Sequence, residues 1–142
     1  KNIDIAHMMY AQLKTRKIGI PFEEDDVIIE VHNSWYSAFT VIRDMLLGVR
    51  PSTKNRDIIN VGMMVLNDGM RPHLTKWQAK FRKWYRLEAD KVENKSLTPQ
   101  EIQRMYPGYN ELKEDLVKSQ NEILKLIDEL EKIYKNESKQ EV

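Results

Sequence analysis

The sequence feature that most constrains the fold is an apolar stripe in residues 28–49. Apolar side chains recur there at helical spacing: Ile28, Val31, Trp35, Ala38, Phe39, Ile42, Met45, Leu46 and Val49. At 3.6 residues per turn they fall within a wedge of roughly 100°, the width of a core-facing helix surface. The stripe predicts a helix of roughly 40 Å that ends at Arg50-Pro51. We interpret the preceding acidic run, Glu23–Asp26, as favourable charge at the N-terminus of this helix.

Three further segments have the same periodicity. Residues 2–17 form a short amphipathic pattern with apolar groups at three- and four-residue steps, and Gly19 and Pro21 end it. Residues 55–89 and 109–135 give two longer patterns of the same kind. Between these two, Thr98-Pro99-Gln100-Glu101 combines a capping hydroxyl, a proline at the first helical position and a glutamate three residues after the cap. That combination predicts a further short helical turn.

Gly69 and Pro72 interrupt the segment 55–89. Proline lacks an amide hydrogen and crowds the preceding turn, so two interpretations are open: one helix kinked near Gly69, or two helices with a tight break. The apolar residues on either side stay in phase, at Leu66, Met70, Leu74 and Trp77. This phase favours the kinked helix.

Amphipathic helices that each carry one apolar stripe bury those stripes against one another. The sequence therefore predicts an all-α protein, an antiparallel four-helix bundle with a short first helix and a Pro-kinked third helix. We expect residues 1–142 to form one domain, with a frayed tail at 136–142.

The composition narrows the classes of function. The 23 basic and 22 acidic side chains nearly cancel, so net charge gives no argument for a nucleic-acid or membrane partner. The chain has no cysteine, which excludes disulfides, thiolate nucleophiles and Cys-ligated zinc. No apolar run is long enough to span a bilayer.

We expect no catalytic residues, cofactor or metal. The chain has three histidines, and none follows a glutamate at the Glu-x-x-His spacing of di-iron bundles. His32 lies at the border of its apolar stripe and is interpreted as a hydrogen-bonded boundary histidine rather than a metal ligand. The acidic run lacks the central glycine and alternating ligands of a calcium loop. One alternative stays open: an enzyme or toxin site assembled from different helices, with His32, Glu30, His73 and Arg71 as candidates.

The most distinctive segment is 71–86, which carries six Lys or Arg, no acid and four aromatic residues. On a helix, Trp77, Phe81 and Trp84 share the apolar face, and we expect them in the core. Basic side chains lie roughly opposite: Lys76, Lys80, Lys83 and Arg86. They form either a solvated face or a docking surface for an acidic protein, anionic lipid headgroups or nucleic acid.

Arg71-Pro72-His73-Leu74 and Lys76-Trp77, preceded by Val65-Leu66-Asn67, resemble a segment of uncharacterised bacterial helical domains that follow N-terminal membrane segments. The resemblance covers about 20 of the 142 residues, around Arg71–Trp77, and carries no catalytic residue with it. It implies that the start at Lys1, rather than Met, reflects removal of a membrane anchor.

The preferred hypothesis is a non-catalytic helical interaction domain, the cytosolic part of a membrane-anchored bacterial protein. A nucleic-acid-binding module that uses the basic helix face is the first alternative, and the assembled enzyme site is the second. We expect a cytoplasmic location and a protein partner. The near-heptad apolar spacing of the last helix makes homodimerisation through that helix a further hypothesis.

Overall fold

The structure, a computed structural model, describes the backbone of residues 2–141 and the side chains of residues 5–136. Within that range it is all-α, without a β-strand, as predicted. The helical elements, in chain order, are α1 (Asn2–Lys14), η1 (Lys17–Gly19), α2 (Ile28–Gly48), α3 (Arg56–Met64), η2 (Val65–Met70), α4 (Arg71–Ala89), η3 (Val92–Asn94), α5 (Pro99–Gln103) and α6 (Tyr109–Glu141).

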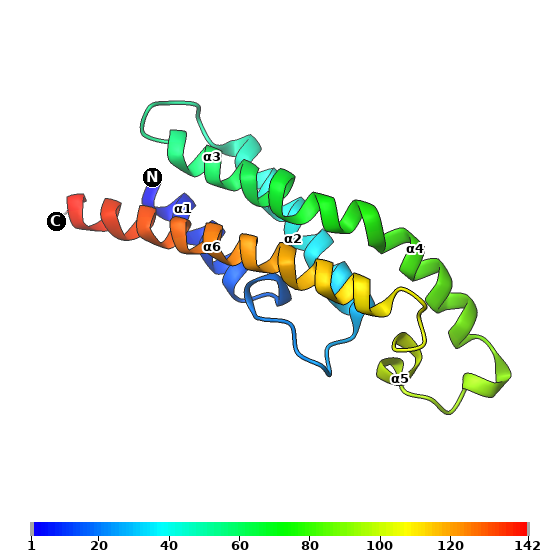
Figure 1. Cartoon of the computed structure of the whole chain (residues 1–142). Coiled ribbons are helices and arrows are strands. Elements are labelled where there is room, and N and C mark those ends of the chain that lie inside the picture. Colours follow the sequence, from blue (N-terminus) through cyan, green and yellow to red (C-terminus); the bar gives the residue numbers. More distant parts are fainter. Residues whose placement is uncertain (1, 142) are drawn as a thin grey trace.

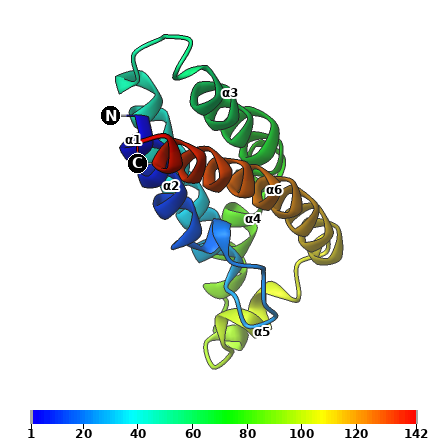
Figure 2. The ribbon, with the colours of Figure 1, turned by 90° about the vertical axis from the view of Figure 1, so that its left-hand side faces the viewer.

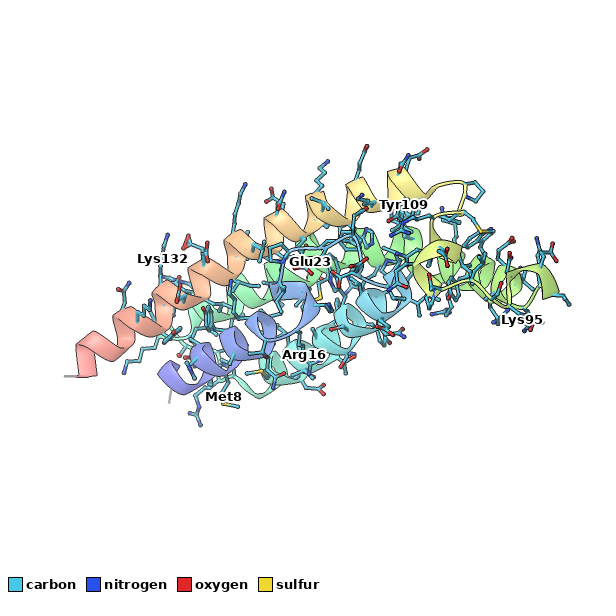
Figure 3. The ribbon with its side chains drawn as sticks, turned by 90° about the horizontal axis from the view of Figure 1, so that it is seen from below. Met8, Arg16, Glu23, Lys95, Tyr109 and Lys132 are labelled. Carbon is cyan, nitrogen blue, oxygen red and sulfur yellow. The ribbon has the colours of Figure 1, made fainter. Side chains whose placement is uncertain are left out.

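The long elements pack lengthwise in an elongated molecule. The run α3–η2–α4 extends from one end to the other, and α6 returns in the opposite direction (Figure 1). Helix α1 packs against α6, and α2 packs against α1, α3 and α4. The start of α1 and the end of α6 lie near each other (Figure 2). Met8 and Lys132 are near that end of the molecule and Lys95 is at the other (Figure 3).

Helix α6 is longer than the sequence predicted. It extends to Glu141, whereas the apolar pattern indicated an end near residue 135. The predicted frayed tail falls on residues 136–142. The side chains of 137–142, and residue 142 altogether, lie outside the described residues.

The helical structure continues without a break from Arg56 to Ala89, and Pro72 is accommodated by a π-helical segment, η2. The amide of Arg71 donates to the carbonyl of Leu66, five residues earlier rather than four. This wider turn directly precedes Pro72, whose ring would crowd the carbonyl four residues before it in a regular α-helix. Of the two interpretations of this segment, the break is therefore wrong.

The core contains the apolar stripe that the sequence singled out. In α2, Trp35, Ala38 and Ile42 are fully buried, while Phe39, Met45 and Leu46 are half-buried. In α4, Trp77 and Phe81 are buried and Trp84 is half-buried. The inward orientation of Trp77 and Phe81 is confirmed, and that of Trp84 holds in part.

The acidic run lies at the N-terminal end of α2, just before the helix begins at Ile28, and it also makes specific contacts. Asp26 pairs with Lys17 and accepts a hydrogen bond from the Glu23 amide. The free amide of Ile28 donates to Oε1 of Gln103 (2.8 Å), a side chain from α5. Contacts with the neighbouring chain segments, rather than helix-end charge alone, therefore explain this run.

A second buried glutamine fixes the connection between α1 and α2. Gln120 of α6 is 3% exposed. Its amide nitrogen donates to the carbonyls of Lys17, Ile18 and Ile20, and its oxygen accepts from the amide of Phe22 (2.9 Å). Backbone groups of a buried loop need such partners, so Gln120 anchors the loop to α6.

The predicted start of α5 is confirmed. The Thr98 hydroxyl accepts from the amide of Glu101, and the Glu101 carboxylate accepts from the amide of Thr98. This reciprocal pair is a capping box. It fixes α5 in the position from which Gln103 reaches α2.

Candidate functional site

The candidate site is a buried contact between two histidines that are 41 residues apart in sequence. His32 lies in the second turn of α2 and His73 in the first turn of α4. Their Nε2 atoms are 2.9 Å apart and their ring planes are inclined by 60°. His32 is 2% exposed and His73 is 0% exposed. His32 is hydrogen-bonded, as predicted, but the prediction that it lies at a boundary is wrong, because α4 covers it.

Asp115 of α6 extends this contact toward solvent. Its Oδ2 atom lies 2.9 Å from Nδ1 of His73 and accepts a hydrogen bond from the indole nitrogen of Trp77 (3.1 Å). His73 and Trp77 are four residues apart on α4, so one carboxylate oxygen receives two donors from one helix face. The Asp115 side chain is 32% exposed. His32, His73 and Asp115 thus form a series of hydrogen bonds, called the polar chain below, that leads from the core to the surface.

The chemistry of Asp115 assigns the protons of both neutral imidazoles. A carboxylate only accepts hydrogen bonds, so Nδ1 of His73 carries the hydrogen in the bond to Asp115. Nε2 of neutral His73 is then an acceptor, and the facing Nε2 of His32 must be the donor. Hydrogen bonds are donated in one direction, from His32 to His73 to Asp115.

Burial keeps both rings neutral at pH 7. Burial is the main cause that lowers the pKa of His32 to about 3, and the positive charges of His73 and Arg82 act in the same direction. For His73, burial lowers the pKa although the hydrogen bond and charge of Asp115 raise it; Lys76 lowers it further. Both histidines therefore differ from a solvent-exposed imidazole, which titrates near pH 6.5.

Aromatic side chains enclose the histidine pair. The Trp35 ring lies 5.4 Å from the His73 ring, and the Phe81 ring lies edge-on to His32 at 6.3 Å. The Trp35 indole nitrogen is buried and has no hydrogen-bond partner within the described part of the chain. In this packing no substrate-sized molecule reaches either imidazole.

The structure brings together two of the four residues considered for an assembled enzyme site. His32 and His73 are in contact, but Glu30 and Arg71 are exposed. Arg71 bonds to Asn67 and its guanidinium lies over the Phe39 ring at 4.9 Å. The four residues do not form a common site.

Sequence reasoning missed Asp115. A signal was present, because Asp115 lies three residues after Leu112 and directly before Leu116, both of which are fully buried in α6. An acid at the edge of an apolar stripe is usually solvated, so this position alone only allows a partner on a facing helix. Choosing His73 as that partner required the relative positions of α4 and α6, which periodicity does not give.

The four predicted docking residues are all exposed on α4. They are called the cation stripe below: Lys76, Lys80, Lys83 and Arg86. Among the side chains of residues 5–136, no carboxylate forms an ion pair with any of them. The ammonium groups of Lys76 and Lys80 lie 5.1 and 5.2 Å from the Trp77 ring centroid. The stripe and the histidine chain therefore share Trp77, whose indole nitrogen bonds to Asp115.

The fold and the site define an all-α protein with a buried His–His–Asp hydrogen-bond chain. Comparison of the chain with protein-family models, curated proteins and solved structures gave no match. Among the described residues, no three His, Asp or Glu side chains are grouped so that they could hold a metal ion. Within the same range, every helix is too short or too polar to cross a membrane.

Proposed function

We propose that this chain is a non-catalytic helical interaction domain and that the cation stripe docks an acidic segment of a partner protein. The observation that carries the proposal is the exposure of Lys76, Lys80, Lys83 and Arg86 without a carboxylate partner in the described part of the chain. The stripe runs from Lys76 to Arg86, eleven residues, which is about 15 Å along the helix axis. A surface of one charge sign favours association with an acidic partner.

Trp77 supports the proposal because it restrains two lysine side chains of the cation stripe before a partner binds. Two ammonium groups lie within 5.2 Å of its ring centroid, at cation–π distance. The ring itself is only 4% exposed. Lysine side chains lose rotamer freedom on binding, so partial ordering before binding reduces that loss.

Burial of the aromatic residues favours a protein partner over single-stranded nucleic acid. Proteins that bind single strands stack bases on accessible aromatic rings beside the cations. Trp77 and Phe81 are buried, while Trp84 and Tyr85 are half-buried, so this surface offers exposed charge but no fully accessible aromatic ring on which a base could stack. Enclosure of both imidazoles likewise favours a non-catalytic role.

The proposal also covers the arrangement of the helices and the cellular location of the domain. The scaffold is an antiparallel four-helix bundle of α1, α2, the α3–η2–α4 run and α6, with the third helix bent near Pro72. As the resemblance around Arg71–Trp77 implies, the domain belongs to a membrane-anchored bacterial protein, and we propose that it faces the cytoplasm.

The test compares two fourfold variants with the same change in net charge. The first removes the cation stripe: Lys76→Gln, Lys80→Gln, Lys83→Gln and Arg86→Gln. The control removes exposed cations from other elements: Lys14→Gln, Arg43→Gln, Lys54→Gln and Lys118→Gln. Binding of each to a fluorescent poly-L-glutamate peptide is measured by anisotropy over a range of salt concentrations.

We expect the stripe variant to bind at least about fivefold more weakly, since four surface charge contacts contribute roughly 1–4 kcal/mol together. The control should stay within about threefold of the wild type, because its affected charges are dispersed. Equal weakening of both variants would refute a localised docking surface. Tighter binding to duplex DNA, or to phosphatidylserine vesicles, than to the peptide at equal salt would contradict a protein partner.

A further inference from the structure

The proposed docking function makes no use of the buried contact between His32 and His73. That contact has a limited capacity for protons. With both rings neutral, one Nε2–H donates to the other Nε2 across 2.9 Å. Histidine is the side chain whose ordinary pKa lies between pH 5 and 8. Mild acid therefore favours the addition of protons to these two imidazoles.

A first proton can enter without breaking the contact. If His73 takes it, both of its nitrogens become donors, toward Asp115 and toward His32. The hydrogen of His32 must then move to Nδ1, so that its Nε2 becomes the acceptor. Asp115 is the only one of the charged groups found to act on the pair that favours the new charge.

A second proton cannot enter. With both imidazoles charged, each Nε2 carries a hydrogen, and two N–H groups would point at each other across 2.9 Å. Two like charges at this separation, in a site that excludes water, also repel strongly. The contact can hold no proton or one, but not two.

The charged groups around the pair come from each helix packed against it. Arg82 acts on His32 from α4, and Lys76 acts on His73 from the same helix. Asp115 acts on His73 from α6. On α2, Glu30 lies two residues before His32 but acts on Tyr85 instead. Two cations therefore oppose protonation and one carboxylate favours it.

We infer that the His32–His73 contact is an acid-sensitive switch in the packing of α2 against α4: it is closed while the imidazoles share at most one proton and opens when both are protonated. Opening exposes both rings to water, where each binds a proton near pH 6.5. Acid therefore favours the open form. The inference rests on the histidine contact rather than on docking to the cation stripe, although Lys76 of that stripe is one of the two cations that oppose protonation.

The test is amide hydrogen exchange of α2 and α4 between pH 6 and pH 5, corrected for the intrinsic exchange rate at each pH. For every imidazole that gains a proton on opening, the equilibrium constant for opening rises about tenfold per pH unit. The wild-type constant should rise between about tenfold and about a hundredfold per unit. Carboxylates titrate mainly near pH 4, below this window.

His32→Gln separates the switch from general acid sensitivity. The glutamine amide can donate to Nε2 of His73 but does not titrate. We expect its opening constant to rise less steeply than that of the wild type, by at most about tenfold per pH unit. The matched control is His7→Gln, since His7 is exposed on α1. Its slope should equal that of the wild type.

Equal slopes clearly above tenfold per pH unit for His32→Gln and the wild type would overturn the inference, because the variant lacks the second titrating ring; at slopes near tenfold the imidazole titration decides. A direct readout is the ¹⁵N NMR titration of the imidazoles in the wild-type protein, which remains decisive if the variant fails to fold. Neutral rings at pH 6, with the hydrogen of His73 on Nδ1, support the switch. Double protonation near pH 6.5 with α2 and α4 still protected from exchange would exclude it.

Discussion

Removal of the Asp115 carboxylate should destabilise the protein in proportion to the hydrogen bonds that are lost. Asp115 accepts from both His73 and Trp77 through one oxygen. A hydrogen bond to a charged group contributes about 1.5–3 kcal/mol, and the lower end applies because water reaches a side chain that is 32% exposed. Two such bonds give about 3 kcal/mol for Asp115→Ala. Asp115→Asn keeps a neutral acceptor and should lose about 1 kcal/mol.

The assay is urea unfolding at pH 7 followed by far-UV circular dichroism, with the free energy of unfolding extrapolated to water. Glu114→Ala is the matched control, because Glu114 is the adjacent, exposed acid of α6. It should change the free energy of unfolding by less than about 0.5 kcal/mol. If Asp115→Ala and Glu114→Ala were equally stable, the polar chain would contribute nothing to the packing of α4 against α6, and the argument would fail.

Three other substitutions test the packing around the site by the same unfolding assay. Gln120→Leu removes the hydrogen-bond partner of the loop between α1 and α2 and should lower the free energy of unfolding by roughly 3 kcal/mol. The control is Asn121→Leu, because Asn121 is exposed on the same helix. It should change the free energy of unfolding by less than about 0.5 kcal/mol. Gly69→Ala places a Cβ 2.5 Å from Cγ1 of Ile123 and should destabilise by about 1–3 kcal/mol. In an Ile123→Ala background that loss should disappear; a persistent loss would show that backbone rather than side-chain crowding is responsible. Thr98→Ala removes the hydroxyl that caps α5 and should lower the free energy of unfolding by about 1 kcal/mol. An unchanged midpoint of urea unfolding would mean that the cap does not stabilise the protein.

The all-α fold was predictable because each long helix carries its own apolar stripe. Trp35 and Ile42 are buried where the helical spacing places them. The capping box at Thr98 was also predictable, since both of its partners lie within four residues. The apolar stripes and the capping box each involve residues that are close together in the sequence. Helical periodicity alone therefore predicts which side chains of a stripe face inward.

The loop anchors were not predictable, because their partners are far apart in sequence. Gln120 reaches Phe22 across 98 residues, and Gln103 reaches Ile28 across 75. Neither glutamine stands out in an amphipathic pattern, where a polar residue at the edge of a stripe is usually solvated. The same holds for the contact of His73 with Asp115, which depends on how α4 and α6 are rotated relative to each other.

The π-helical segment accounts for that rotation, and its signal is present in the sequence. At about 100° per residue, the buried positions of α3 before the segment are Ile58 and Gly62, whereas those after it centre on Leu74, Trp77 and Phe81. Between the two sets the buried face advances by about 110°, close to the angle of one residue. A π-turn inserts one such residue, so it returns the later set to the same side of the helix. Without it, the residues of α4 that form the polar chain would turn away from α2 and α6. The segment that accommodates Pro72 is thus also the one that positions His73 against His32 and Asp115.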